Sequence, residues 1–376
     1  MASATVVVAG ALANKPDQAG EAWVKLSWVR GLQRLGFDVW FVEQLAESMR
    51  YDERAPRWFR SVTERFGLSG RSVLLSAGQS LAGASADELL EVAPEASLVN
   101  ISGHLTEEPL FGRFRRRVMV DIDPGFTQFW HLEGLAGANV AGHDAYFTIG
   151  ERIGKDDCPI PTGGIEWRPV RQPVVLEDWP LVDPGAGNRF TTIATWRGPF
   201  GPVEHGGRTY GLKVHEFRRF IELPRRLPYR FEVALDIDPG DDRDLEALRR
   251  NGWEVADPRE VAADPDALRA YIQGSGAEFS PAQGMYVDTA CGWFSDRSVR
   301  YLASGKPVLV QDTGFSHILP VGEGLLAFRT LEEAVAGAGE IASNYDEHCA
   351  AARAIAEEYF DAERVLTGFC EQAKIG

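Results

Sequence analysis

Short apolar runs alternate with amphipathic segments along almost the whole chain, and each run ends in a polar or glycine-containing loop. The runs at 5–9, 37–42, 97–101 and 118–120 have the pattern of strands buried on both faces, as in parallel sheets. Between them, apolar residues recur at helical spacing. The alternation predicts an α/β fold of parallel sheets with right-handed β-α-β crossovers.

The pattern is broken between residues 158 and 188, where prolines and glycines are frequent and leave little room for regular structure. Because single cores rarely grow beyond about 250–300 residues, a chain of 376 residues predicts two domains. A second α/β run starts at 189 and includes a glycine-rich insertion at 199–211. We expect four parts: an N-terminal domain over 1–165, a linker over 166–188, a C-terminal domain over 189–360 and a final segment over 361–376.

The stretch 294–317 has the most specific pattern. Ser295 can cap a helix that starts at Asp296, and Gly305 can end that helix. An apolar strand follows at 307–310 and ends in the polar loop 311–314. Open α/β sheets bind ligands at the carboxyl ends of their strands, so this order predicts half of a nucleotide site.

In the first half, polar loops follow the strands near 101 and 120, at the same sheet edge as the loop after the first strand. Glu43 ends the second strand, where dinucleotide-binding folds place an acid on a ribose. The G-x-G-x-x-G fingerprint is missing between Gly10 and Gly20, so we interpret Glu43 as a surface or inter-domain acid.

The pentapeptide Asp-Ile-Asp-Pro-Gly occurs at 121–125 and again at 236–240, each time after an apolar strand. We interpret the repeat as coincident turn chemistry, because Asp, Pro and Gly each favour turns. Asp236 and Asp238 imitate a D-x-D metal motif, for which a turn is the better explanation.

Charge and cysteine usage exclude several classes of protein. The net charge is −16, from 55 acids and 39 bases, and such a surface repels nucleic acids and anionic membranes. The four cysteines contain no CxxC pair, which predicts neither a metal site nor a disulfide framework and favours the cytoplasm. No apolar run approaches the roughly 18–20 residues of a membrane span.

Two segments carry a family resemblance. Residues 301–310, YLASGKPVLV, resemble the helix–Gly–x–Pro–strand segment of the donor domain of GT-B glycosyltransferases, and residues 31–39 resemble the first helix and second strand of that family. The resemblance implies two Rossmann-like doubly wound domains that face a cleft, as in the bacterial enzymes that use nucleotide sugars. The acceptor then binds the N-terminal domain, the nucleotide sugar binds the C-terminal domain, and the helix in 361–376 crosses back to the N-terminal domain.

The chain departs from the family at two positions. Many retaining members carry a ribose-binding glutamate where this sequence has Arg300, and a partner acid where it has Gly292. Many inverting members use a histidine in the first loop as base, yet no histidine precedes His104. Retention or inversion, and the identity of the base, therefore stay open.

His104 and Asp123 are the catalytic candidates, because both follow strands at the expected acceptor edge. Asp123 is the candidate base for an acceptor hydroxyl; holding its turn explains it equally well, and Asp121 shares that ambiguity. His104 resembles a histidine that some members place beside the donor sugar, and a hydrogen-bonded structural histidine is the alternative. The candidates for the donor site follow strands or open the helix at 296, where phosphate can meet basic side chains and N–H groups: Arg197, Ser295, Asp296, Arg297, Arg300, Asp312, Thr313 and Gly314. For these, capping and solvated arginines are the alternatives.

The resemblance thus implies a hexosyltransferase-type enzyme that moves a sugar from a nucleotide-diphosphate sugar to a small-molecule or glycan acceptor. The resemblance implies no metal and no cofactor apart from the donor, since N–H groups can hold a diphosphate. We expect no nucleic-acid partner and no stable membrane insertion, and a homodimer stays open. A sugar-nucleotide epimerase or hydrolase of the same fold, and a non-catalytic nucleotide- or glycan-binding protein, are the alternatives.

Overall fold

The computed structural model describes residues 3–135, 137–183, 185, 187–198 and 200–376. Pro184 and Ala186 of the predicted linker, and Pro199 of the predicted insertion, lie outside the described residues. Two compact units are present. The first unit comprises the chain up to Ile149, Pro161–Val175 and Asp361–Gly376, and the second unit comprises Gly150–Ile160 and Leu176–Phe360.

Among the described residues, the first unit has a sheet of eight strands in the order β4-β3-β2-β1-β5-β6-β7-β8. All neighbours are parallel except β3 and β4, which form an antiparallel pair that the sequence pattern did not predict. From β1 the strands follow one another towards one edge of the sheet, and from β5 they follow one another towards the other edge. The topological switch point therefore lies between β1 and β5. The strands are β1 Thr5–Ala9, β2 Asp38–Gln44, β3 Ser72–Ser76, β4 Gln79–Gly83, β5 Ser97–Ile101, β6 Arg116–Asp121, β7 Ala145–Thr148 and β8 Trp167–Pro169.

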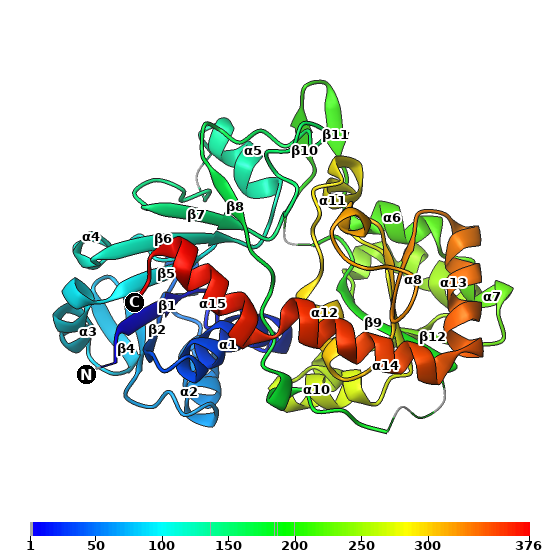
Figure 1. Cartoon of the computed structure of the whole chain (residues 1–376), viewed down its shortest axis with the longest axis horizontal. Coiled ribbons are helices and arrows are strands. Elements are labelled where there is room, and N and C mark those ends of the chain that lie inside the picture. The colour runs from blue at the N-terminus through cyan, green and yellow to red at the C-terminus, as the bar shows by residue number, and fades with distance from the viewer. Residues whose placement is uncertain (1–2, 136, 184, 186, 199) are drawn as a thin grey trace. The chain divides into compact units, whose positions relative to one another are not determined.

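Helices connect these strands, and the last helix of the chain belongs to the same unit. Figure 1 shows α15 in red beside α1 in blue. The rings of Trp28 in α1 and Phe369 in α15 pack edge to face, with 5.0 Å between their centroids. Gly31 of α1 makes room for Leu366, because a Cβ at position 31 would lie only 2.4 Å from Leu366 Cδ1. The helices are α1 Ala19–Arg34, η1 Glu47–Met49, α2 Arg54–Arg65, α3 Ala86–Val92, η2 Ala93–Glu95, α4 Leu110–Arg113, α5 Phe126–Leu132 and α15 Ala362–Ala373.

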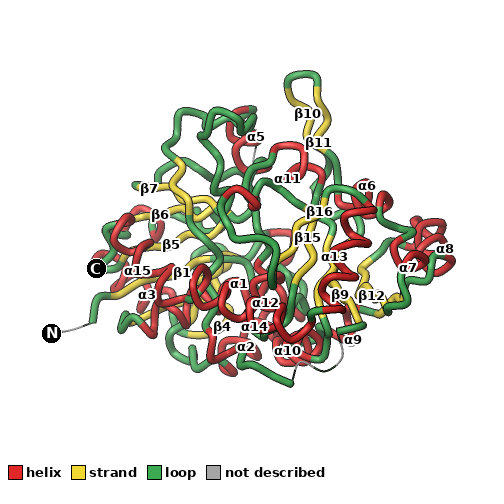
Figure 2. Tube along the Cα trace, turned by 45° about the vertical axis from the view of Figure 1, so that its right-hand side comes forward, coloured by secondary structure: helices red, strands yellow, loops and turns green. Residues whose placement is uncertain are grey.

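The second unit contains an all-parallel sheet in the order β13-β12-β9-β14-β15-β16, with its switch point between β9 and β14. A separate hairpin of β10 and β11 lies in the segment predicted as a glycine-rich insertion, and β11 contacts α11 (Figure 2). The strands are β9 Arg189–Thr195, β10 Val203–His205, β11 Arg208–Tyr210, β12 Arg230–Asp236, β13 Glu254–Ala256, β14 Ala277–Ser280, β15 Val308–Gln311 and β16 Leu325–Phe328.

The helices of the second unit lie on both faces of this sheet, as expected when strands are buried on both sides. They are η3 Leu176–Asp178, α6 Lys213–Arg219, α7 Leu223–Arg226, η4 Pro239–Asp241, α8 Asp242–Arg250, α9 Pro258–Val261, α10 Pro265–Gln273, α11 Gly284–Thr289, α12 Asp296–Ala303, η5 Phe315–His317, α13 Leu331–Ser343, α14 Tyr345–Ile355 and the π-helix Ala356–Phe360.

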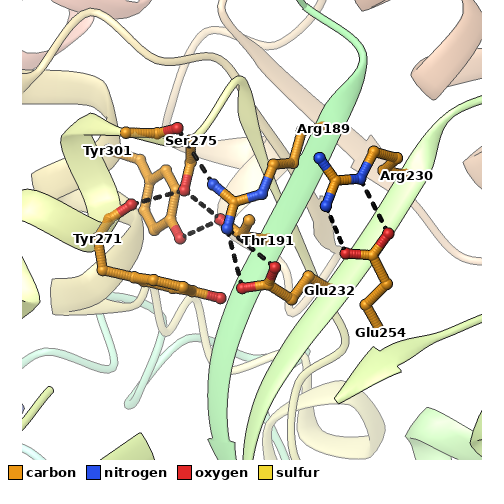
Figure 3. A network of polar contacts seen from close by, with 9 residues as sticks. Arg189, Thr191, Arg230, Glu232, Glu254, Tyr271, Ser275 and Tyr301 are labelled. Carbon is orange, nitrogen blue, oxygen red and sulfur yellow. Dashed lines mark hydrogen bonds and ion pairs between the residues drawn. The ribbon is translucent and has the colours of Figure 1, made fainter. Parts of the chain in front are cut away.

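The two edges of this sheet serve different purposes. At the amino ends of the strands, Arg189 makes two 2.9 Å bonds to Glu232, and the buried hydroxyl of Thr191 lies 2.6 Å from the hydroxyls of Ser275 and Tyr301 (Figure 3). This network joins β9, β12 and α12, and beside it the buried Tyr271 hydroxyl has no hydrogen-bond partner among the described residues. The carboxyl ends are therefore the edge that remains for ligands.

No described helix is long and apolar enough to cross a membrane. Within the described ranges, no group of three His, Cys, Asp or Glu side chains is placed to hold a metal ion. None of the four cysteines forms a disulfide bond.

Candidate functional site

Glu43, at the end of β2, is a buried loop anchor. Its side chain is 0% exposed. The carboxylate accepts hydrogen bonds from the backbone N–H groups of Leu12, Ala13 and Asn14 at 2.8, 2.5 and 2.8 Å, and so holds the loop after β1. Burial raises the pKa of Glu43 to about 7, and the three N–H donors oppose that rise. The interpretation as a surface or inter-domain acid is wrong, because these donors come from a neighbouring strand end that the sequence pattern does not pair with Glu43.

Asn100, at the end of β5, holds the loop that carries His104. Its side-chain oxygen accepts from the N–H of Leu105 at 3.0 Å, and its amide nitrogen donates to the Leu105 carbonyl at 2.9 Å. Gln44 continues the same support, because its side-chain oxygen accepts from the N–H groups of Thr106 and Glu107 at 2.9 and 3.0 Å. The backbone on the C-terminal side of His104 is therefore fixed.

Asp121, at the end of β6, fixes the turn that carries Asp123. One carboxylate oxygen accepts from the Asp123 N–H at 3.0 Å and the Thr127 hydroxyl at 2.7 Å. The other accepts from the Gln128 amide at 2.8 Å and the Thr148 hydroxyl at 2.7 Å. All four acceptor positions are filled, which resolves the ambiguity at Asp121 in favour of the structural role.

A charged triad from the loop after β1 and from α1 completes this edge. Glu21 accepts from Lys15 Nζ at 2.5 Å through one oxygen and from Lys25 through the other. Lys25 is only 3% exposed, and its stem lies over Gly10, where a Cβ would stand 3.0 Å from Lys25 Cγ and 3.7 Å from Ile101 Cβ. The triad thus lies at the β1/β5 switch point. Burial opposes the ionisation of Glu21, but Lys25 and Lys15 hold its pKa well below its usual range.

At this edge the side chains of His104 and Asp123 have free hydrogen-bonding capacity. The buried hydroxyl of Ser102, in the same loop as His104, also lacks a hydrogen-bond partner among the described residues. Neither the imidazole nor the carboxylate has a hydrogen-bond partner within the described part of the chain. Burial is the main cause that raises the pKa of Asp123 to about 7. The charges of Asp121 and Glu21 also raise this pKa, and those of Lys15 and Lys25 lower it. Burial, with Lys25 and Lys15, lowers the pKa of His104 to about 4. The two predicted catalytic residues therefore lie within the field of the same triad, with a neutral imidazole and a titratable carboxyl.

In the second unit, the predicted donor-binding arginines are paired within the protein. Arg197 contacts the Asp241 carboxylate through two nitrogens. Arg297 uses all three guanidinium nitrogens, on Glu278 at 2.6 Å, on the Ile193 carbonyl at 2.8 Å and on the Ser280 hydroxyl. These contacts join α12 to β9 and β14, so the guanidinium stabilises the two strands that flank the switch point.

The remaining predicted donor-site residues shape α12 and the loop after β15. Arg300, only 3% exposed, pairs with Asp296 at 2.6 Å one turn away. Ser295 caps α12 by accepting from the Arg297 N–H at 3.2 Å, as the alternative interpretation held. Asp312, Thr313 and Gly314 all lie in the loop after β15, where Thr313 donates to the Trp293 carbonyl and Asp312 accepts from the Gly314 N–H at 2.9 Å. Their predicted contact with a donor stays a prediction.

Lys213 is the residue that the sequence analysis missed. It is the first residue of α6, which follows β9 and its hairpin, and its ammonium has no partner among the described residues. Burial, and then the nearby Arg297, lower the pKa of Lys213 to about 7. A lysine at the start of the first helix after a predicted first strand is the signal that identifies it, since that helix start faces the switch point.

Comparison with known proteins identifies the fold. No protein-family model matches the chain, and no curated protein matches it. Among solved structures, Anabaena HepE in complex with UDP-glucose has a TM-score of 0.59 at 12% identity over 98% of this chain and 99% of that one. AviGT4, a glycosyltransferase involved in avilamycin A biosynthesis, has a TM-score of 0.52 at 14% identity over 98% and 97%. Sucrose-phosphate synthase from Thermosynechococcus elongatus has a TM-score of 0.56 at 11% identity over 98% of both chains.

These matches extend over nearly the full length of each protein, so they concern both Rossmann-like units. The chain has the GT-B fold of nucleotide-sugar glycosyltransferases, and the predicted fold class is confirmed. At these identities the likeness shows the fold alone, so the activity is argued from the site.

Proposed function

We propose that the protein transfers a hexosyl group from a nucleoside-diphosphate sugar to a hydroxyl of a small-molecule or glycan acceptor. The observation that carries the proposal is Lys213 at the β9/β14 switch point of a GT-B donor domain, whose ammonium has no partner among the residues that the structure describes. Support comes from HepE, whose complex contains UDP-glucose. The residues of the second unit offer the leaving diphosphate a cation without a metal ion.

The pKa of Lys213 gives this role a physical basis. At neutral pH a lysine with a pKa of about 7 is only half protonated. A diphosphate beside it favours the charged form, so binding takes up a proton and weakens as pH rises above 7. The same charge stabilises the leaving group when the bond from the anomeric carbon to the phosphate oxygen breaks.

The first unit supplies the acceptor chemistry. Asp123, when ionised, accepts the proton of the acceptor hydroxyl as the oxygen attacks the sugar, and its pKa of about 7 suits a base near neutral pH. His104 is neutral there, because burial and the two lysines lower its pKa to about 4, and it offers one donor or acceptor to a sugar hydroxyl.

Titration calorimetry with UDP, dTDP, GDP and ADP tests the donor assignment. We expect one of them to bind with a dissociation constant below millimolar, and Lys213→Ala to weaken that binding at least about tenfold, the loss of one charge-assisted contact. Lys155→Ala, at an exposed lysine of the same unit, is the matched control. The proposal fails if none of the four binds, or if Lys213→Ala binds like the parent. Consumption of the nucleotide sugar without an acceptor would instead indicate the hydrolase or epimerase alternative.

A further inference from the structure

A polar cavity lies in the second unit, at the carboxyl ends of β15 and β16. Its volume is about 170 Å³, and its polar lining comes from Arg219, Gln311, Asp312, His317 and Arg329. Arg219 is six residues beyond Lys213 on α6, which places the two Cα atoms roughly 9 Å apart along the helix. Lys213 is not among the residues that line the cavity.

Asp312 forms part of one wall of the cavity, and its carboxylate is hydrogen-bonded within the protein. Its side chain is 3% exposed. The carboxylate accepts from the Gly314 N–H at 2.9 Å, the Ser316 hydroxyl at 2.7 Å and Arg329 Nη2 at 2.6 Å. The carboxylate therefore holds one nitrogen of the Arg329 guanidinium at the cavity. The Arg329 Nε and Nη1 groups make no hydrogen bond to the described residues.

Arg219 is held in the same way on the opposite wall. Its Nη1 donates to Glu216 at 2.5 Å, and Glu216 also accepts from the Gln311 amide at 2.5 Å. Its Nη2 lies 3.4 Å from the Arg329 carbonyl, which brings the two arginines to one opening. Both guanidinium groups stay half exposed or more, at 51% for Arg219 and 66% for Arg329. A ligand in the cavity thus meets N–H donors.

His317 adds a third donor. It ends η5 at the rim, it is exposed, and its imidazole has no hydrogen-bond partner among the described residues. The rim itself is tightly packed: a Cβ on Gly314, at φ +90°, would stand 2.4 Å from the Ala290 carbonyl, and Ala290 has φ +45°. A non-glycine residue in that conformation persists only where its surroundings over-determine it. The donors are therefore presented from a fixed frame.

We propose that this cavity binds the phosphate group of a small phosphorylated ligand, or free phosphate, through Arg219, Arg329 and His317. Forked guanidinium groups match the oxygens of a phosphate, and the carboxylates behind them fix their direction. The cavity of about 170 Å³ has room for a phosphate group. The inference does not rest on sugar transfer.

The test is an NMR titration of the full chain with inorganic phosphate and, separately, with glucose 6-phosphate. We expect saturable shifts of the His317 imidazole signals, and at least about tenfold weaker binding for Arg219→Gln, since each lost charge-assisted pair is worth on the order of a factor of ten. Arg230→Gln is the matched control, because Arg230 pairs with Glu254 at the opposite edge of the same sheet. Unsaturable shifts, or equal affinity in Arg219→Gln, would overturn the proposal.

Two further variants separate this site from the donor crevice and from misfolding. Lys213→Ala removes the ammonium at the switch point and should leave phosphate binding in the cavity unchanged. Loss of phosphate binding in Lys213→Ala with retention in Arg219→Gln would place the anion at the switch point and end the proposal. His317→Ala removes no hydrogen bond within the described protein, so weaker phosphate binding at an unchanged melting temperature supports a direct contact. Unchanged binding in that variant contradicts the assigned role of His317.

Discussion

The pentapeptide Asp-Ile-Asp-Pro-Gly is used in opposite ways at its two occurrences. In the first unit, Asp121 is 0% exposed and accepts four hydrogen bonds, and the Asp123 carboxylate has no partner among the described residues. In the second unit, Asp236 is exposed, and Asp238 accepts from the Gly240 N–H at 2.7 Å. The turn interpretation of Asp238 is confirmed, whereas the same turn at Asp123 is held by other groups.

The cause lies in the residues around each copy. At the first copy, Gln128 accepts from the Gly125 N–H at 2.7 Å, the position that Asp238 serves in the second. Thr127 and Thr148 then bring hydroxyl donors to the first aspartate. Because Gln128 holds the turn in the first copy, the Asp123 carboxylate is not needed for that purpose. Such an arrangement places a candidate base on a fixed backbone.

The largest expected difference between the copies is catalytic. Asp123→Asn should lower the sugar-transfer rate by about 10²–10⁴-fold, the usual contribution of a general base. Asp238→Asn should leave the rate unchanged, because that carboxylate only closes a turn. Initial rates with the donor identified by calorimetry measure both, and equal activity in Asp123→Asn and the parent would remove Asp123 from the mechanism.

The Asp123→Asn variant also has a stability control. A carboxyl whose folded pKa is raised to about 7 stabilises the fold below its unfolded pKa near 4, and this contribution is lost as pH rises through 7. Asp123→Asn should therefore be more resistant to urea than the parent at pH 8, and this excess should shrink towards pH 4. A variant that is both inactive and less stable at pH 8 would point to misfolding.

The next-largest expected difference between the two copies is in the free energy of unfolding. Asp121→Ala leaves two hydroxyls, an amide and a backbone N–H without their acceptor, and it should lower the free energy of unfolding by roughly 3 kcal/mol. Asp236→Ala, at the exposed equivalent, should change it by less than about 0.5 kcal/mol. Urea unfolding monitored by circular dichroism tests the pair. Similar losses at both positions would mean that the buried network contributes nothing beyond the turn.

The glycines of the two copies differ as well. Gly125 has φ +89°, so Gly125→Ala should cost about 1–2 kcal/mol of unfolding free energy. Gly240 does not adopt a positive φ, and a Cβ there would stand 3.1 Å from the movable Asp238 Oδ1. Gly240→Ala should therefore stay within about 1 kcal/mol of the parent in either direction, since Ala restricts the unfolded chain. Thermal unfolding of both variants measures this, and a larger loss at Gly240 would reverse the comparison.

The smallest effect concerns the pH profile of transfer. The rate should fall as pH falls through about 7, where Asp123 takes up its proton. Because Glu21 raises the pKa of Asp123 and Lys25 lowers it, Glu21→Gln should move the midpoint to lower pH and Lys25→Met to higher pH. At pH 7 each should change the rate by less than about tenfold. Profiles that move in the same direction would show that the triad does not act through its charge.

Local pattern was sufficient for the fold class, although not for the antiparallel pair of β3 and β4. The alternation of apolar runs and helical periodicity determined the α/β class, because burial of a strand or a helix face imposes its own period on the sequence. The strand-end loops at 102–104, 121–128 and 311–314 could be located for the same reason. The resemblance of 301–310 to a donor-domain segment then indicated GT-B, and the fold match agrees.

Only the tertiary structure decided which polar group is used and which is free. Glu43 is a loop anchor because three N–H groups from the loop after β1 reach it, and Arg297 is a support because β9 and β14 surround it. Within the described ranges, Lys213 and Asp123 have no hydrogen-bond partner for their side chains, because the neighbouring polar groups bond to other residues. Hydrogen-bond partners come from strands far apart in the sequence, so identical pentapeptides acquire different chemistry once those strands are side by side.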